Sequence, residues 1–336
     1  MTEPLLQVED LAVEFASRDG VVRAVDGVSY SVSAGRTLAI VGESGSGKSV
    51  SSLAVMGLLP TPPARIVGGR ALLGGRDLLS LPAKEHRAVC GEHIAMVFQD
   101  ALAALNPVHP VGWQLTEALV ARGRISRRDA RKRAVELLDL VRVPHAAQRV
   151  KDYPHQFSGG MRQRVMIAMA LALDPEVLIA DEPTTALDVT VQAQIMRLLA
   201  EIQAERQMGL VLITHDLGVV ADVADEVVVM YAGRVVERAD VLSAYGSPAH
   251  PYTKALLASI PRLDQKGGEL SVIPGRPPEA GRVPDGCPFH PRCDYAQDVC
   301  RTSPRPSPVA VGEGRTARCH FAADVLAGRT PEEAGR

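Results

Sequence analysis

Short runs of aliphatic residues alternate along this chain with longer stretches of helical periodicity. The runs Thr37–Val41, Val177–Ala180 and Leu210–Thr214 are apolar at almost every position. Such continuous apolar runs are typical of strands that helices cover on both faces, as in a parallel sheet. Because each run is followed by a helix-like pattern, the sequence predicts an α/β fold with a mixed or parallel sheet.

Two segments depart from this alternation. Residues of about 100–160 are helical in pattern and without strands, which predicts an α-helical subdomain inserted into the core. After residue 249 the prolines and cysteines become dense, and only "HPYTKALLASIP" predicts a short helix. We therefore expect a core domain over 1–249, with the helical insert inside it, and a small Cys-containing C-terminal module over 250–336.

The segment GESGSGKS, Gly42–Ser49, lies between a predicted strand and a predicted helix. It matches G-x-x-x-x-G-K-[ST], in which glycines let backbone N–H groups surround phosphate oxygens. Lys48 would supply positive charge to the β- and γ-phosphates, and the Ser49 hydroxyl would bind Mg²⁺. The core is therefore expected to be a RecA-like P-loop NTPase that binds a nucleoside triphosphate through Gly42, Glu43, Ser44, Gly45, Ser46, Gly47, Lys48, Ser49 and Val50.

Two acids follow the apolar run VLIA. Asp181 and Glu182 would lie at the carboxyl edge of the sheet, where α/β proteins bind ligands. Asp181 suits a role linked to Mg²⁺, and Glu182 could polarise the water that attacks the γ-phosphate. Two acids that merely cap a strand end are the structural alternative, which is weak beside a phosphate loop.

A second anion site is predicted at FSGG. Ser158 is a good N-cap, and Gly159 and Gly160 would let a phosphate approach the first N–H groups of the following helix. The chain has one phosphate loop, so the simplest geometry is that each nucleotide is shared across a dimer interface.

With these motifs in order, residues 5–245 resemble the ATP-binding subunits of ABC transporters. GESGSGKS resembles the Walker A motif, VLIADE the Walker B motif and FSGG the family signature, although Met161 replaces its usual glutamine. The resemblance implies that Gln99 is the Q-loop residue that contacts Mg²⁺, and that His215 acts with Glu182 in hydrolysis. It also implies that ATP is contacted in trans by Ser158, Gly159, Gly160 and Asp188.

Two of these residues have an ordinary structural alternative. A histidine after a buried strand, such as His215, is often only a packed or capping residue. Phe15 is placed to stack on adenine, as an aromatic near the N-terminus does in this family, but it could equally be a core residue of the first strand.

Transport is favoured over the other uses of this ATPase. The charges nearly balance, with 37 basic and 39 acidic residues, and aromatic residues make up 4%, so nucleic acid is not an expected partner. The sequence shows no pattern of a secretory signal and no apolar run of about 20 residues, so we expect a cytosolic subunit that docks at the membrane.

The C-terminal segments SPAHPYTKALLASIP and GCPFHPRCDYAQDVC resemble the tails of oligopeptide/dipeptide importer ATPases. This resemblance implies ATP hydrolysis that powers uptake of di- or oligopeptides at the cytoplasmic face. It also implies a second, paralogous ATPase subunit, two permeases and an external binding protein. Import of nickel or another small solute is the alternative within transport, and a non-transport ABC ATPase is the alternative outside it.

Four cysteines, Cys287, Cys293, Cys300 and Cys319, occupy the C-terminal module. A cytosolic location argues against disulfides, and Cys₄ ligation at wide, varied spacing suits a [4Fe–4S] cluster. Zinc is the alternative metal, although structural zinc sites usually use pairs of cysteines that are closer in sequence. Cysteines that bind no metal are a third interpretation. Resemblance to the peptide-importer tails points to the cluster.

Overall fold

The computed structural model describes residues 3–18, 20–185, 187–260, 272–279 and 281–334. The chain divides into two compact units, each described by itself. The insert unit comprises Met1–Leu5, Val32–Arg36 and Leu81–Ile213, and the loop unit comprises Leu6–Ser31, Thr37–Ser80 and Thr214–Arg336. Among the described residues, no helix combines the length and the apolar character that crossing a membrane requires.

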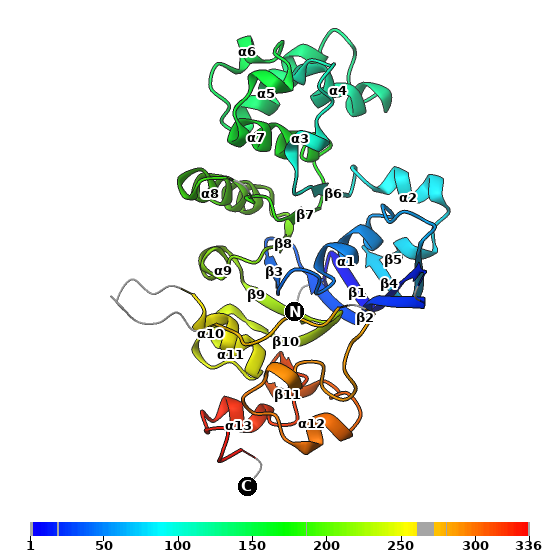
Figure 1. Ribbon diagram of the computed structural model, residues 1–336. Coiled ribbons are helices and arrows are strands. Elements are labelled where there is room, and N and C mark those ends of the chain that lie inside the picture. Colours follow the sequence, from blue (N-terminus) through cyan, green and yellow to red (C-terminus); the bar gives the residue numbers. More distant parts are fainter. Residues whose placement is uncertain (1–2, 19, 186, 261–271, 280, 335–336) are drawn as a thin grey trace. The chain divides into compact units, whose positions relative to one another are not determined.

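The insert unit combines a group of helices with three strands (Figure 1). Its elements are α2 (Ala83–Val89), β6 (Ile94–Val97), α3 (Ala101–Ala104), α4 (Val111–Ala121), α5 (Ala130–Leu140), α6 (Ala146–Arg149), η2 (Pro154–Gln156), α7 (Gly159–Ala170), β7 (Val177–Asp181), α8 (Val189–Arg206) and β8 (Gly209–Ile213).

The three strands of the insert unit run parallel in the order β6-β7-β8. Every residue of β6, β7 and β8 is buried, as expected for parallel strands covered on both faces. The helices α4, α5 and α7 pack against one another, and their buried side chains include Leu115, Leu137 and Val165. The helical insert and the apolar strands of the sequence are therefore both present in this unit.

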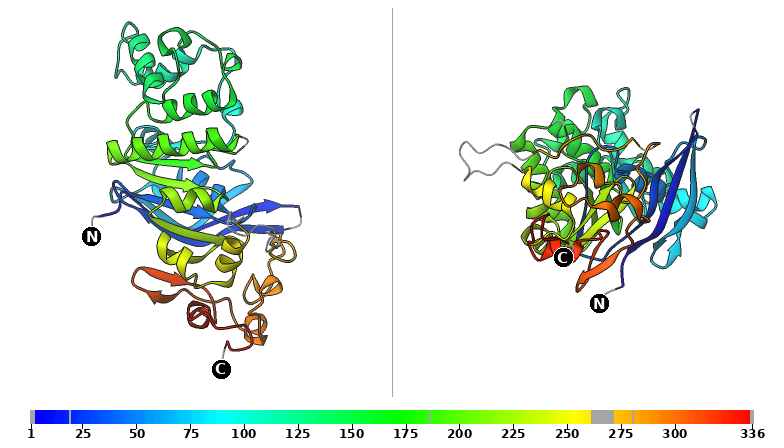
Figure 2. Two further views of the ribbon diagram at one scale, coloured as in Figure 1. Left: turned by 90° about the vertical axis from the view of Figure 1, so that its left-hand side faces the viewer. Right: turned by 60° about the horizontal axis from the view of Figure 1, so that its bottom comes forward.

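The loop unit combines two sheets with short helices (Figure 2). Its elements are β1 (Leu6–Ser17), β2 (Gly20–Val32), β3 (Thr37–Val41), α1 (Lys48–Val55), β4 (Ala64–Leu73), β5 (Arg76–Asp77), η1 (Leu78–Ser80), α9 (Leu217–Val223), β9 (Glu226–Tyr231), β10 (Arg234–Asp240), α10 (Val241–Gly246), α11 (Pro251–Ala258), η3 (His290–Arg292), α12 (Asp298–Thr302), β11 (Val309–Gly312), β12 (Arg315–Ala317) and α13 (Ala322–Leu326).

One sheet of the loop unit has the strand order β2-β1-β4-β5, with β1 antiparallel to β4. In the other, β3 is parallel to β9, and β10, β12 and β11 continue the layer as antiparallel strands. The predicted mixed sheet is confirmed, and β3 delivers the chain into the segment Gly42–Ser49 at its carboxyl end.

The residues after 249 pack onto this second sheet of the loop unit. The hairpin β11–β12 adds to the edge strand β10, where Arg238 pairs with Thr316. Tyr252, Phe289 and Phe321 join one hydrophobic cluster with side chains of β3, β9 and β10. The extension thus shares a core with the strands that carry the phosphate loop, and the boundary at residue 249 stays a prediction.

Candidate nucleotide-binding site

The backbone of the phosphate loop can be formed only by glycine at two positions. Gly42 has φ 148°, and a Cβ there would lie 2.2 Å from the carbonyl oxygen of Met230. Gly47 has φ 99°, and a Cβ there would lie 2.5 Å from the carbonyl oxygen of Ala24. Because L side chains are disfavoured at such φ and no space is left for them, the loop is framed closely by β2 and β9.

Lys48 begins helix α1 directly after this loop. Its side chain is buried, and Nζ donates hydrogen bonds to the carbonyl oxygens of Gly42 at 2.7 Å and Glu43 at 3.0 Å. The Ser46 hydroxyl is buried and has no hydrogen-bond partner within the described residues. A curled backbone, a buried ammonium group and the amino end of α1 together form a cradle suited to phosphate.

Phe15 and His215 are the other two residues of the loop unit that were predicted to contact ATP. Phe15 is half-buried on β1, opposite Ala64 of β4. His215 is exposed and precedes Asp216, whose carboxylate accepts the N–H of Val219 as the N-cap of α9. The roles of Phe15 with adenine and of His215 in hydrolysis stay predictions.

In the insert unit, the two acids end strand β7. Asp181 is its last residue and is buried, and Glu182 follows with φ 46°, a value that residues other than glycine rarely adopt. The Glu182 N–H donates to the Ile213 carbonyl at 2.8 Å. Its Oε2 accepts hydrogen bonds from Gln99 Nε2 at 3.0 Å and Thr185 Oγ1 at 2.9 Å. The predicted Gln99 and Glu182 therefore meet, in a strained backbone of the kind found at functional sites.

Thr185 is a residue that the sequence interpretation missed. Its hydroxyl reaches the Glu182 carboxylate, and its N–H donates to the Glu182 carbonyl at 3.2 Å. The only signal was its place three residues after Glu182, where a turn would return it to that carboxylate.

The predicted trans residues lie at the beginnings of two helices of the insert unit. The Ser158 hydroxyl accepts the Met161 N–H at 3.4 Å as the N-cap of α7, which confirms the predicted cap. The Asp188 carboxylate accepts the Val191 N–H at 3.0 Å as the N-cap of α8. A Cβ on Gly160 would lie 2.5 Å from Val191 Cγ1, so Gly160 also allows α7 and α8 to approach closely.

A cavity of about 510 Å³ in the insert unit joins the Q-loop and signature segments. It is lined by Gln99, Asp100, Ala101, Leu102, Gly159, Arg162, Gln163, Thr185 and Leu187. Gln99, which binds Glu182, and Gly159 of the signature therefore border the same space.

Residues of the C-terminal extension reach the phosphate loop. The Glu43 N–H donates to Tyr252 Oη at 2.9 Å, and the Arg292 guanidinium donates to both Glu43 carboxylate oxygens at 2.6 and 2.9 Å. The Glu43 carboxylate is the main cause that raises the pKa of Arg292. Neither contact was predicted, because they join residues 209 and 249 positions apart.

The four cysteines of the extension lie together in the loop unit. Cys287 and Cys300 are buried in its hydrophobic cluster, and Cys293 and Cys319 pack against that cluster. Burial is the first cause that raises the pKa of Cys319 to about 12, and the nearby Cys287 and Cys300 thiols raise it further. Across the described residues, however, no three or more His, Cys, Asp and Glu side chains are arranged to hold a metal ion.

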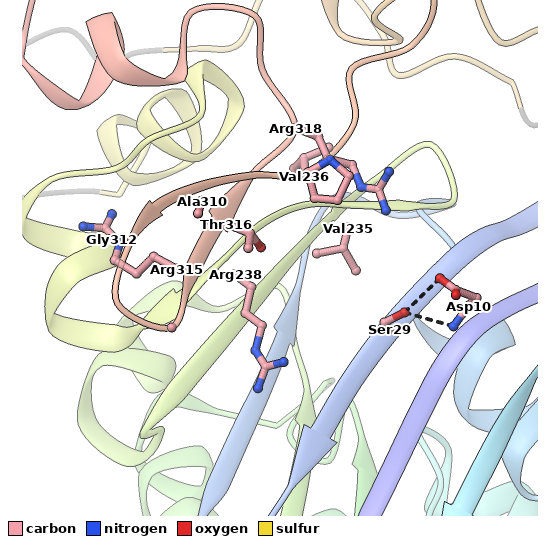
Figure 3. A pocket seen from close by; sticks show the side chains of 12 residues that line it. Asp10, Ser29, Val235, Val236, Arg238, Ala310, Gly312, Arg315, Thr316 and Arg318 are labelled. Carbon is pink, nitrogen blue, oxygen red and sulfur yellow. Dashed lines mark hydrogen bonds between the residues drawn. The ribbon is translucent and has the colours of Figure 1, made fainter.

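A cavity of about 410 Å³ is lined by residues of β10, by the hairpin β11–β12 and by Asp10 and Ser29 (Figure 3). Two of its arginines are already engaged: Arg238 binds the Glu226 carboxylate at 2.8 Å, and Arg315 donates to the Ser247 carbonyl at 2.7 Å.

Comparison with known proteins agrees with this geometry. The family model "ABC transporter" matches residues 25–185, and the model "Oligopeptide/dipeptide transporter, C-terminal region" matches residues 236–300. The oligopeptide transport ATP-binding protein OppD of Salmonella typhimurium is 51% identical over 316 residues, which cover 94% of this chain and 93% of that protein. The dipeptide transport ATP-binding protein DppD of Bacillus subtilis is 53% identical over 298 residues, 89% of each chain.

Solved structures lead to the same family. A dimeric bacterial ABC transporter cassette is similar with a TM-score of 0.63 and 27% identity, covering 70% of this chain and 98% of that one. The same cassette in a post-hydrolysis state, bound to ADP and Pi, matches equally well. These findings confirm the P-loop α/β fold and the family resemblance. The chain belongs to the ABC transporter ATPases, in the group of oligopeptide/dipeptide transport ATP-binding proteins.

Proposed function

We propose that this chain hydrolyses ATP to power an importer of di- or oligopeptides. The observation that carries the proposal is Glu182. Its carboxylate is held by Gln99 and Thr185 at the end of a buried strand, beside Asp181, in a chain that also contains a complete phosphate cradle. Hydrolysis needs such a preoriented carboxylate to activate water.

The residues of the site divide the chemistry between them. The loop Gly42–Val50 binds the phosphates, with Lys48 as the positive charge. Ser49, Gln99 and Asp181 would hold Mg²⁺, which neutralises charge on the phosphates when bound. Glu182 accepts a proton from the attacking water, and His215 contacts the γ-phosphate. Phe15 stacks on adenine.

The nucleotide is shared between two ATP-binding chains in this proposal. Ser158, Gly159, Gly160 and Asp188 contact the nucleotide that the partner's phosphate loop holds. Support comes from the amino end of α7, where Ser158 caps a helix of 12 residues whose first turn contains no acidic side chain. An anion is favoured at such a helix end.

The importer assignment rests on the C-terminal extension and the relatives. We propose that the chain works at the cytoplasmic face of the membrane, with a second and paralogous ATPase subunit, two permeases and an extracytoplasmic binding protein. Nucleic acid is not part of this assembly. Peptides are the proposed cargo because the relatives of about 50% identity are named for oligopeptide or dipeptide transport.

Uptake by a strain that lacks this chain tests the function. Labelled dipeptide and oligopeptide uptake should be lost and should return with the wild-type gene but not with Glu182→Gln. Nickel uptake, measured in parallel, should not change. Loss of nickel uptake with normal peptide uptake would contradict the proposed cargo.

We also propose that Cys287, Cys293, Cys300 and Cys319 bind a [4Fe–4S] cluster. Support comes from the place of all four side chains in or against one hydrophobic cluster, although within the described residues they are not arranged around a metal ion in this structure. The four thiols would lose their protons on binding iron, and the cluster would hold the extension together.

Metal analysis of anaerobically purified protein decides between the interpretations of the cysteines. The proposal predicts iron and acid-labile sulfide in equal amounts, with absorbance in the visible region. One zinc per chain would favour a structural zinc site instead. Four thiols that react at once with a thiol reagent, without any metal, would contradict both.

A further inference from the structure

The phosphate loop contains an acid at an unexpected place. Glu43 is the second residue of GESGSGKS, in a loop whose other features all favour an anion. A carboxylate within several ångströms of a nucleotide's phosphates repels them unless a positive charge compensates it. In this structure the carboxylate makes a two-pronged ion pair with Arg292, at 2.6 and 2.9 Å.

Arg292 is held in place from several sides. Its side chain is only 4% exposed, and Nε donates to the Pro274 carbonyl at 2.8 Å. Its guanidinium also lies over the Tyr231 ring, 5.9 Å from the ring centroid. A planar guanidinium with its donors engaged this way fixes the direction of the carboxylate it binds.

A second contact holds the backbone of the same residue. Tyr252 Oη accepts the Glu43 N–H at 2.9 Å, and the Tyr252 ring is fully buried against Tyr231 and Phe289, with ring centroids 4.7 and 5.2 Å apart. Both the main chain and the side chain of Glu43 are therefore positioned by residues of the extension, which lie far away in sequence.

We propose that the C-terminal extension sets the nucleotide affinity of the phosphate loop through Arg292. Arg292 is a positioning residue: it neutralises Glu43 and keeps its carboxylate turned away from the phosphates. The proposal rests on the loop being the ATP site. Without Arg292, Glu43 would keep its negative charge inside the loop and would compete with phosphate for Lys48 and the loop N–H groups.

A second substitution that relieves the effect of the first distinguishes charge repulsion from general damage to the fold. Arg292→Gln should weaken binding of Mg-ATP about tenfold or more, because one uncompensated charge then acts close to the phosphates. Glu43→Gln removes the repelling charge itself and should weaken binding of Mg-ATP less than Arg292→Gln does. The double variant should bind Mg-ATP more tightly than Arg292→Gln alone, so the effects of the two substitutions should not add.

The measurement is titration of the purified full-length chain with a fluorescent ATP analogue and Mg²⁺, at low and high salt. The penalty of Arg292→Gln should shrink as salt rises, since screening weakens charge repulsion. Arg238→Gln is the matched control, because Arg238 also pairs with a carboxylate, that of Glu226, but on β9 and β10. The ATP affinity of Arg238→Gln should equal that of the wild type.

Three results would overturn the inference: an unchanged affinity in Arg292→Gln, a double variant as weak as Arg292→Gln, or an equal loss in Arg238→Gln. Failure of wild-type protein to bind ATP would instead refute the nucleotide site itself. Thermal unfolding and metal content are measured for each variant. If Arg292→Gln does not fold, Arg292→Lys keeps the charge without the two-pronged geometry and should show a smaller loss of affinity.

Linkage provides an independent readout. If the contact of the extension with the phosphate loop favours ATP binding, ATP must favour that contact by the same factor. Hydrogen exchange over residues 287–300 should therefore slow when ATP is added to the wild type, and much less in Arg292→Gln. Equal slowing in both would contradict transmission through this ion pair.

Discussion

At the scale of one residue, Glu182 shows how the proposed base is held in position. Its backbone occupies the left-handed region at φ 46°, and two donors, Gln99 and Thr185, bind one of its carboxylate oxygens. The local sequence predicted that Glu182 lies at the end of a strand, and the family resemblance predicted that Gln99 belongs to the site. Thr185 and the backbone conformation were not predicted, because they depend on a turn that no side-chain pattern marks.

Replacing Glu182 by glutamine tests its proposed role as the base. The amide keeps the size and hydrogen-bonding capacity of the side chain but cannot accept the proton, so the ATP hydrolysis rate should fall about 10²- to 10⁴-fold while ATP binding persists. Glu176→Gln is the matched control, because Glu176 precedes the same strand β7 and is exposed. Normal hydrolysis by Glu182→Gln would rule out this base.

His250 is a buried residue whose neutral form supports the fold. Its Nδ1 accepts the Tyr252 N–H at 3.0 Å, and its own N–H donates to the Glu237 carboxylate at 2.9 Å. Burial lowers the pKa of His250 to about 4. The unfolded chain, with a histidine pKa of about 6.5, takes up the proton first as pH falls. The free energy of unfolding should therefore decrease as pH falls from about 6.5 towards about 4.

Urea unfolding at pH 7 and pH 5 measures this contribution. His250→Asn keeps an N-cap acceptor without a titrating ring, so it should lose about 2 kcal/mol less stability than the wild type between these pH values. Glu237 titrates in both proteins, and its effect cancels in the difference. His155→Asn, a change at an exposed histidine, should behave as the wild type does. Equal losses for His250→Asn and wild type would contradict the assignment.

At the scale of elements, the patterns of the sequence predicted the strands β3, β7 and β8, the helical insert and the cap of α7. Their periods and end signals are local and can be read directly. The pairing of β12 with β10 and the contacts of Tyr252 and Arg292 with Glu43 could not be predicted, because they depend on tertiary packing between distant segments. The spacing of the cysteines predicted that they lie in one part of the fold, but the metal cluster that they would bind stays a prediction.

The close frame around the phosphate loop gives a prediction at this scale. Gly42→Ala would place a Cβ 2.2 Å from the Met230 carbonyl oxygen, so the loop or β9 must shift. We expect a loss of about 1–3 kcal/mol in stability and severe loss of ATP binding. Gly20→Ala is the control, since Gly20 has φ 124° but no atom within 4 Å of its Cβ position. Calorimetry and nucleotide titration measure both; intact ATP binding in Gly42→Ala would contradict the frame.

At the scale of the whole molecule, ordered motifs identified the family, and relatives of about 50% identity confirm it. The phosphate loop and the signature segment lie in different units of the chain, and in the proposed function each provides one half of a nucleotide clamp. Cargo selection would belong to the permeases and the binding protein, so no residue of this sequence could predict it. The partner subunit is inferred from the clamp and from resemblance.

Light scattering of Glu182→Gln tests the clamp most directly. The full-length variant is measured with Mg-ATP or Mg-ADP, alone and with the second ATP-binding chain of its transporter. We expect a dimer of ATP-binding chains with Mg-ATP and dissociation of this dimer with Mg-ADP. A strictly monomeric chain at saturating Mg-ATP, with and without that partner, would contradict the shared nucleotide site.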